Sequence, residues 1–254
     1  MIYDVHAHMD HFKEEELIEI LKRAKEKNIG FIVSNSVDLA SAKKVLELSK
    51  KFPMIKASLG YYPQDALSKE DNSRKADKFP DLKKLILENK KIVCAIGEIG
   101  MDFSTGTREK HNEQETLFRQ QLDLARELNI PAIIHTRGAE REIVEILKDY
   151  PTIKKILHCF CGRTSLIKEA INIGCYFSIP CSMNRMENFK NTLMLSPKEK
   201  ILTETDSPYL APIKGETNEP AFIVETIKEI SKVWNLPEEE TEKIIEKNTK
   251  QIFK

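Results

Sequence analysis

The sequence predicts an α/β fold, a TIM-type (β/α)8 barrel formed as a single domain over residues 1–254. Three observations support this prediction. Short apolar runs alternate with amphipathic stretches along the whole chain, and eight of these runs resemble strands. Most of the runs do not alternate between apolar and polar residues, which is typical of parallel strands buried on both faces. Eight such units in about 250 residues match the size of a barrel, with a doubly wound open sheet as the alternative.

The strand-like runs are short and apolar. The first lies within DVHAHMD at residues 4–10, where His6 and His8 share one face because side chains alternate along a strand. The other runs follow in chain order at residues 29–33, 54–60, 91–100, 131–135, 155–160, 175–179 and 200–206.

Between these runs, apolar side chains recur at helical spacing. The first such stretch, at residues 12–28, places charged residues between Leu17, Ile20, Leu21 and Ala24. Further helices are predicted at residues 39–51, 81–89, 107–129, 140–148, 165–173, 221–234 and 238–252. The remaining segments are predicted to be loops or less regular structure: residues 61–79, 181–199 and 207–219.

The charge composition argues against a protein that attracts nucleic acid through an overall positive field. Forty basic and forty acidic residues cancel to a formal charge of zero, so any phosphate binding must come from a local patch. Apolar residues make up 41% of the chain, which is ample for a folded core. The chain contains no sequence repeat, low-complexity tract or flexible linker, which favours one domain.

The cysteines and the apolar runs bear on the compartment. The five cysteines are odd in number, and their spacing resembles no disulfide framework. The opening MIYDVHAH has the character of neither a signal peptide nor a transit peptide. No apolar run approaches the ~20 residues that span a bilayer. We therefore expect a cytoplasmic protein, monomeric and without a membrane partner.

Histidines and carboxylates stand at the carboxyl ends of five of the predicted strands. In a barrel these ends meet at one mouth, where the active site of this fold lies. Imidazoles and carboxylates gathered there would repel one another or stay unpaired unless cations held them. Any one of them could be a core residue or a helix cap, but together they predict a metal site. The residues are His6, His8, Glu98, His135, His158 and Asp206.

The ligand set indicates two divalent cations. A carboxylate can bridge two cations, and Glu98 on a central strand is the natural bridge. One cation would lie between Glu98 and the ligands of the first and last strands, and the other between Glu98 and the later histidines. Two cations ~3.5–4 Å apart polarise a phosphoryl or carbonyl oxygen and acidify a water, whose proton Asp206 could take. Mixed imidazole and carboxylate ligands suit Zn, Mn, Co or Fe better than Mg.

Six sequence motifs surround these residues and span nearly the whole chain in order. They are DVHAHMD at 4–10, GEIGMDF at 97–103, IPAIIHTR at 130–137, LHCFCG at 157–162, ETDSPYLAP at 204–212 and NEP at 218–220. Together they resemble the TatD family of metal-dependent hydrolases and DNases, within the wider amidohydrolase superfamily. The resemblance implies a TIM barrel with one to three divalent metals, held by the six residues above, and Asp206 as the catalytic base.

The chain departs from the family pattern at three places. Members usually carry G-x-H-P-H after the third strand, whereas residues 60–64 read GYYPQ, so Tyr62 and Gln64 replace both histidines. Thr217 stands where arginine is common, and Gly138 where aspartate is common. We expect none of these changes to touch a metal ligand, so they should affect the choice of substrate.

Five other polar residues are candidates for orienting a ligand or for binding substrate. Glu204 shares a strand face with the predicted base and could orient a ligand, or pair with a buried lysine or arginine. Asp102 is a similar candidate. Arg137 and Arg163 follow ligand-bearing strands and could grip a phosphate through two hydrogen bonds, or form surface ion pairs. Asn218 lies in the last loop and is a candidate for substrate binding.

Three functions remain open at this point. The resemblance points to a metal-dependent phosphodiesterase that acts on DNA from the end of a single strand. The neutral charge and the GYYPQ loop favour instead a hydrolase of a small phosphoester, ester or amide. The third function is a non-catalytic protein with structural metals, which the complete set of predicted ligands argues against.

Overall fold

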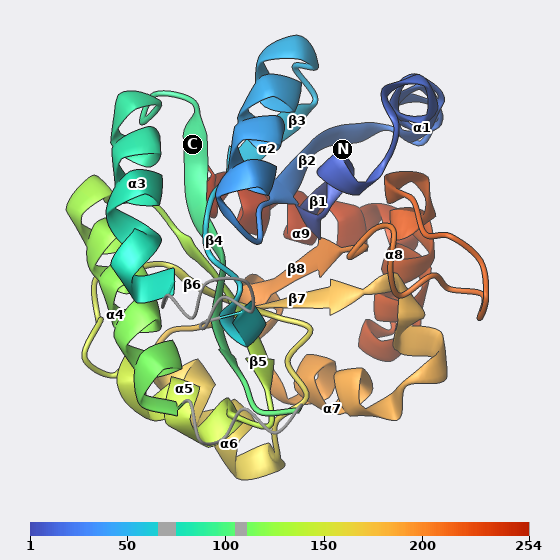
Figure 1. Ribbon diagram of the computed structural model, residues 1–254. Helices are drawn as coiled ribbons and strands as arrows, with labels where there is room; N and C mark the ends of the chain where they lie inside the picture. The colour runs from blue at the N-terminus through green and yellow to red at the C-terminus, as the bar shows by residue number, and fades with distance from the viewer. Residues whose placement is uncertain (66–74, 105–110, 254) are drawn as a thin grey trace.

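Eight parallel strands form a nearly closed barrel in the computed structural model, which describes residues 1–65, 75–104 and 111–253 (Figure 1). Each strand pairs with the next one along the chain. The strands are β1 (Ile2–Ala7), β2 (Ile29–Asn35), β3 (Ile55–Ser58), β4 (Val93–Asp102), β5 (Ala132–Arg137), β6 (Lys155–His158), β7 (Tyr176–Pro180) and β8 (Ile201–Glu204). The predicted barrel is confirmed, and the sequential strand order excludes a doubly wound open sheet.

Hydrogen bonds join the last strand to the first. The Thr203 hydroxyl donates to the carbonyl of Tyr3 at 2.7 Å. Just beyond β8, the backbone N–H of Asp206 donates to the carbonyl of His6 at 2.9 Å. These bonds bring the carboxyl end of β8 against that of β1, so residues from opposite ends of the chain share one mouth.

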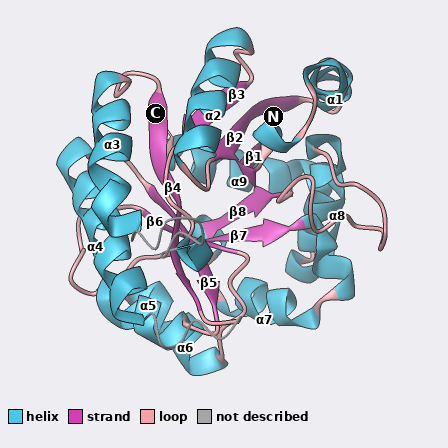
Figure 2. Cartoon of the chain, viewed as in Figure 1, coloured by secondary structure: helices cyan, strands magenta, loops and turns pink. Residues whose placement is uncertain are grey.

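Helices surround the strands on the outside of the barrel (Figure 2). They are α1 (Glu14–Glu26), α2 (Leu39–Lys51), α3 (Lys75–Glu88), α4 (His111–Leu128), α5 (Glu140–Leu147), α6 (Thr164–Asn172), α7 (Glu187–Leu195), α8 (Ile223–Trp234) and α9 (Glu238–Ile252). The cap of α2 shows how the sequence starts a helix, because the Asp38 carboxylate accepts the N–H of Ser41 at 2.7 Å. Among the described residues, no helix is both long and apolar enough to cross a membrane.

The core has two parts. The larger part packs the outer faces of the strands against the helices. The smaller part takes one apolar residue from each of six strands: Val5, Val33, Ala95, Ile133, Ile156 and Leu202. His135 and His158 stand two residues after Ile133 and Ile156, on the same strand faces. The inside of the barrel is therefore an apolar layer with polar side chains above it.

Some predicted boundaries were wrong. The helix predicted at residues 81–89 begins at Lys75, because the helix continues through Pro80, a residue that usually marks a loop or a helix start. Residues 181–199 contain α7, which buries Phe189 and Leu193 one turn apart although its two asparagines and its threonine are weak helix formers. The start of the helix predicted at residues 107–129 lies outside the described residues.

Candidate metal centre

The predicted ligands converge at the carboxyl ends of the strands. Five of them line one pocket of about 660 Å³, and His6 is fully buried beside it. The other five are His8, Glu98, His135, His158 and Asp206. Convergence follows from the parallel sheet, in which every strand ends at the same side of the barrel.

One group of ligand atoms forms around the two histidines of the first strand. The Nε2 atoms of His6 and His8 lie 3.3 Å apart. Asp206 Oδ1 lies 3.4 Å from the Nε2 of His6 and 3.5 Å from that of His8. Glu98 Oε2 lies 3.7 Å and 3.4 Å from the same two nitrogens. Two imidazole nitrogens and two carboxylate oxygens thus face one small volume.

A second group forms around the other oxygen of Glu98. Glu98 Oε1 lies 3.0 Å from Nδ1 of His135 and 3.9 Å from Nε2 of His158. Glu98 is buried, and its two oxygens face different pairs of histidines. This is the arrangement expected of a carboxylate that bridges two cations.

Contacts on the far side of each ring decide which nitrogen is available. Nδ1 of His8 lies 3.0 Å from the carbonyl oxygen of Asn35, which can only accept, so Nδ1 carries the proton. Nδ1 of His158 lies 2.8 Å from the Glu204 carboxylate, which also only accepts, so this Nδ1 likewise carries the proton. In the neutral rings the lone pairs are therefore on the Nε2 atoms, which face Glu98 and Asp206.

His135 is oriented by a network on its outer side. Its Nε2 lies 3.1 Å from Asp102 and 3.1 Å from the Tyr62 hydroxyl, and that hydroxyl donates to Asp102 at 2.9 Å. The amide of Gln64 also donates to Asp102, at 3.0 Å. The lone pair of a neutral His135 therefore lies on Nδ1, which faces Glu98. Our expectation that the altered loop touches no predicted ligand was wrong, because the Tyr62 hydroxyl contacts His135 directly.

The carboxylates and imidazoles change each other's protonation. Burial raises the pKa of Asp206, but His6 and His8 outweigh it and hold that pKa well below its usual range. Burial likewise opposes ionisation of Glu98, and its histidine neighbours again lower the pKa. Burial lowers the pKa of His8, but Asp206 and Glu98 overcome this and raise it to about 9. Buried anions of this kind need positive charge close by.

The donor set fits divalent cations. Ligand atoms of His6, His8 and Asp206 all lie within 4.8 Å of one another, as do those of Glu98, His135 and His158. Imidazole nitrogens and carboxylate oxygens are ligands for zinc, manganese and cobalt. The geometry thus supports divalent metal binding at this centre.

Known proteins match this chain over nearly its whole length. Residues 3–254 match the family described as TatD related DNase. The chain belongs to the TatD family. An uncharacterized metal-dependent hydrolase of Methanocaldococcus jannaschii is 37% identical over 252 residues, which cover 99% of this chain and 96% of that protein. Human deoxyribonuclease TATDN3 is 32% identical over 258 residues, which cover 99% and 94% of the two chains.

A solved TatD structure has the same fold. The crystal structure of YjjV, a TatD homologue from Escherichia coli, superposes with a TM-score of 0.89 over 99% of this chain and 97% of that chain, at 22% identity. The protein is thus a metal-dependent hydrolase of the TatD family with the barrel of that family. The monomeric state and the cytoplasmic location stay predictions.

The predicted orienting and substrate residues of this TatD protein differ in their positions. Glu204 is buried against His158, and its described contacts include no lysine or arginine. Arg137 is exposed and lines the pocket, whereas Arg163 is exposed at the start of α6 and is not among the described lining residues. Asn218 is fully buried and is not among the described residues that line this pocket.

Several contributors to the TatD site had no prediction of their own. Asp4 accepts the N–H of His6 at 3.2 Å and the N–H of Thr205 at 3.0 Å, and so ties β1 to the segment that carries Asp206. Burial raises the pKa of Asp4 to about 8. Ser178 donates to Glu204 at 2.5 Å. Ser178 is paired with His158 in the register of β6 and β7, and this pairing could have indicated that Ser178 lies near the site.

Replacing Glu204 with glutamine should weaken metal binding without unfolding the protein. Both oxygens of Glu204 accept hydrogen bonds, and in glutamine one of them becomes an NH2 group, which only donates. The glutamine therefore no longer imposes the tautomer and the orientation of the His158 ring. We expect about a ten- to hundredfold loss of affinity for the cation that His158 would bind, measured by competition with a chromogenic chelator. Glu140→Gln is the matched control, since Glu140 lines the pocket outside the ligand cluster. Equal affinities for both variants would contradict the role of Glu204.

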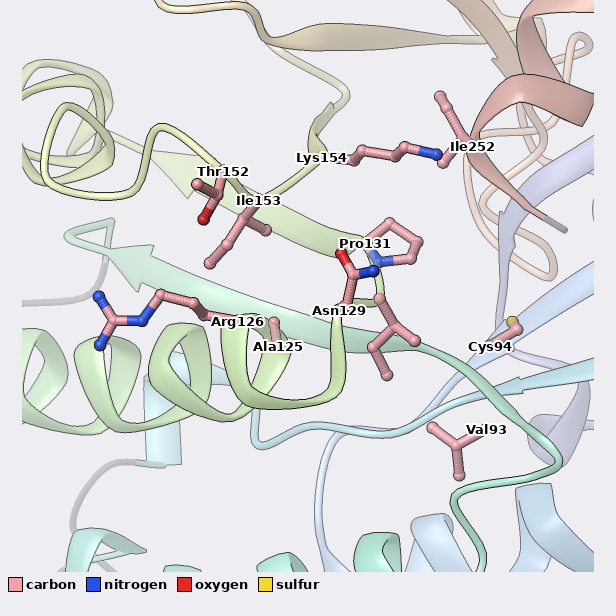
Figure 3. Close-up of a pocket in the computed structure, with 11 residues that line it drawn as sticks. Val93, Cys94, Ala125, Arg126, Asn129, Pro131, Thr152, Ile153, Lys154 and Ile252 are labelled. Atoms are coloured by element: carbon pink, nitrogen blue, oxygen red, sulfur yellow. The ribbon is translucent and has the colours of Figure 1, made fainter.

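A second pocket of this TatD barrel lies at the opposite, amino-terminal end of the strands (Figure 3). It is smaller, about 240 Å³, and Val93, Pro131 and Lys154 mark the starts of three strands around it. Its described lining residues include no histidine, aspartate or glutamate. The chemistry of a metal-dependent hydrolase is therefore assigned to the other end.

Proposed function

We propose that this protein is a deoxyribonuclease that hydrolyses phosphodiester bonds of DNA, starting from the end of a strand. One observation carries the proposal: the two oxygens of Glu98 face two sets of imidazoles at an open pocket. Paired divalent cations suit in-line displacement at phosphorus. The family description and the name of the human relative support DNA as the substrate.

The chain would hold two divalent cations, one in each group of ligand atoms. Zinc, manganese, cobalt or iron suits the mixed ligand set best, and magnesium suits it less well. When bound, such cations neutralise the charge of a phosphoryl oxygen and supply an acidified water. The first would be held by His6, His8, Glu98 and Asp206, and the second by Glu98, His135 and His158.

Asp206 is the residue best placed to accept a proton. It lines the pocket, its side chain is 13% exposed, and its lowered pKa keeps it ionised at neutral pH. Its backbone has φ of 60°, a left-handed conformation that aspartate tolerates better than most residues. The backbone bond to His6 and the bond from Thr205 to Asp4 hold this turn in place. The carboxylate is thus fixed before substrate arrives.

A small phosphoester or ester is the second candidate substrate. Tyr62 lines the pocket beside His135, and Tyr62 and Gln64 both donate to the Asp102 carboxylate. Arg137 is the single lysine or arginine among the described lining residues. A pocket with one such side chain offers a long polyanion few contacts to its phosphates.

An activity panel separates the two candidates. Protein stripped with a chelator and reloaded with Mn²⁺, Zn²⁺, Co²⁺ or Mg²⁺ is given end-labelled single- and double-stranded oligonucleotides, p-nitrophenyl phosphate, bis-p-nitrophenyl phosphate and p-nitrophenyl acetate. We expect progressive shortening of DNA that needs the metal. Asp206→Asn, prepared in parallel, controls for contaminating nuclease. Intact DNA together with fast hydrolysis of a small ester would refute the nuclease and favour the second candidate.

A further inference from the structure

The wall of the pocket opposite Tyr62, which follows β3, is apolar. It is formed after β7 and β8, which stand across the barrel from β3 and β4. The described lining residues on this wall are Met186, Phe189, Tyr209 and Leu210. Tyr209 is 51% exposed, so about half of its surface is open to contact with a ligand.

The backbone of Tyr209 is held firmly although its ring is exposed. Its N–H donates to the carbonyl of Asp206 at 2.7 Å. Its carbonyl accepts from the side-chain amide of Asn218 at 2.6 Å, and the same amide donates to the carbonyl of Thr205 at 2.6 Å. Asn218 is fully buried, so its amide group is shielded from water. A ring on such a backbone loses little freedom when a ligand binds.

The ring itself stands next to the metal centre. The phenol oxygen lies 3.0 Å from Nδ1 of His11. The ring centroid lies 5.9 Å from that of His8, at an interplanar angle of 70°. A ligand that packed on Tyr209 would therefore reach the ligand cluster with its other end.

We propose that Tyr209 is a stacking platform for the nucleobase next to the scissile phosphate, an inference that rests on the proposed nuclease function. A nucleotide joins an apolar, flat base to an anionic phosphate. The pocket joins a flat apolar wall to a centre that attracts anions once cations are bound. Stacking on an aromatic side chain strengthens binding by about tenfold per base or more, with little dependence on base identity. Tyr209 thus sets the preference for nucleic acid over a simple phosphoester.

The test compares Tyr209→Ala, Tyr209→Phe and the wild type on paired oligonucleotides. One oligonucleotide of each pair is complete, and the other carries a tetrahydrofuran abasic residue at one of the three positions nearest the end that the wild type cuts. We expect Tyr209→Ala to raise KM about tenfold on the complete strand and to have no further effect on the strand abasic at the stacked position. Tyr209→Phe keeps the ring and should stay within about twofold of the wild type.

The outcomes separate the platform from the nuclease. If Tyr209→Ala raises KM equally on complete and abasic strands, or leaves it unchanged, Tyr209 does not stack on a base. The proposed nuclease function is not contradicted by that result. If the wild type shortens no DNA, the nuclease fails first and the platform is rejected with it. Metal content equal to that of the wild type shows that Tyr209→Ala leaves the centre intact.

Discussion

Glu98→Ala should abolish hydrolysis, with kcat lower by at least about a thousandfold, because two cations together contribute several kcal/mol to the transition state. Glu98 supplies one oxygen to each group of ligand atoms, at 3.4 Å from His8 Nε2 and 3.0 Å from His135 Nδ1. Without it, the first group keeps His6, His8 and the carboxylate of Asp206, and the second group keeps two imidazoles and no carboxylate. Steady-state kinetics of the variant, treated with metal in the same way as the wild type, on the wild type's best substrate measure the loss.

Two companion variants sharpen this result. Glu98→Gln keeps the volume and one oxygen but loses the charge, so its activity should fall between those of Glu98→Ala and the wild type. Glu140→Ala removes a carboxylate that lines the same pocket outside the ligand cluster, and should behave like the wild type. Circular dichroism checks that each variant is folded. A folded Glu98→Ala that kept more than about a tenth of the activity would rule out the bridge.

Asp206→Asn should lower kcat by about a hundred- to ten-thousandfold while KM changes little, the effect of removing a general base. Asparagine has nearly the same shape and keeps one oxygen near His6 and His8, which lie 3.4 and 3.5 Å from the carboxylate. It cannot accept a proton at neutral pH. Initial rates over a range of substrate concentrations separate kcat from KM.

The same variant also tests whether the centre is catalytic. If Asp206→Asn kept its metal and every activity, Asp206 would not be the base, and a structural role for the metals would gain support. A parallel loss of metal and of activity would instead show that Asp206 acts mainly as a ligand. The elemental content of this variant must therefore be measured beside its kinetics.

The sequence was sufficient for the barrel and for the convergence of the candidate ligands. Both follow from local signals: apolar runs mark the strands, and parallel strands end on one side. His6 and His158 are far apart in the chain, yet their rings stack with centroids 3.6 Å apart. The convergence of these residues could be predicted without knowing any contact, because parallel strands in sequential order bring their carboxyl ends to one side of the barrel.

The network around the ligands could not be predicted in the same way. The acceptor of His8 is the backbone carbonyl of Asn35, and every residue has such a carbonyl, so no residue type marks it. Tyr62 reaches His135 because the segment after β3 folds over the end of β5. Asn218 looked like a substrate residue, but it holds the loop that positions Tyr209. Each of these contacts depends on loop geometry, which apolar patterns do not encode.

The metal content of the wild type and of Glu98→Ala, measured together by elemental analysis after identical loading and desalting, tests the shared centre most directly. A carboxylate that bridges both sites predicts about two divalent ions per wild-type chain and loss of both in the variant. A folded Glu98→Ala that retained the full wild-type metal content would contradict it.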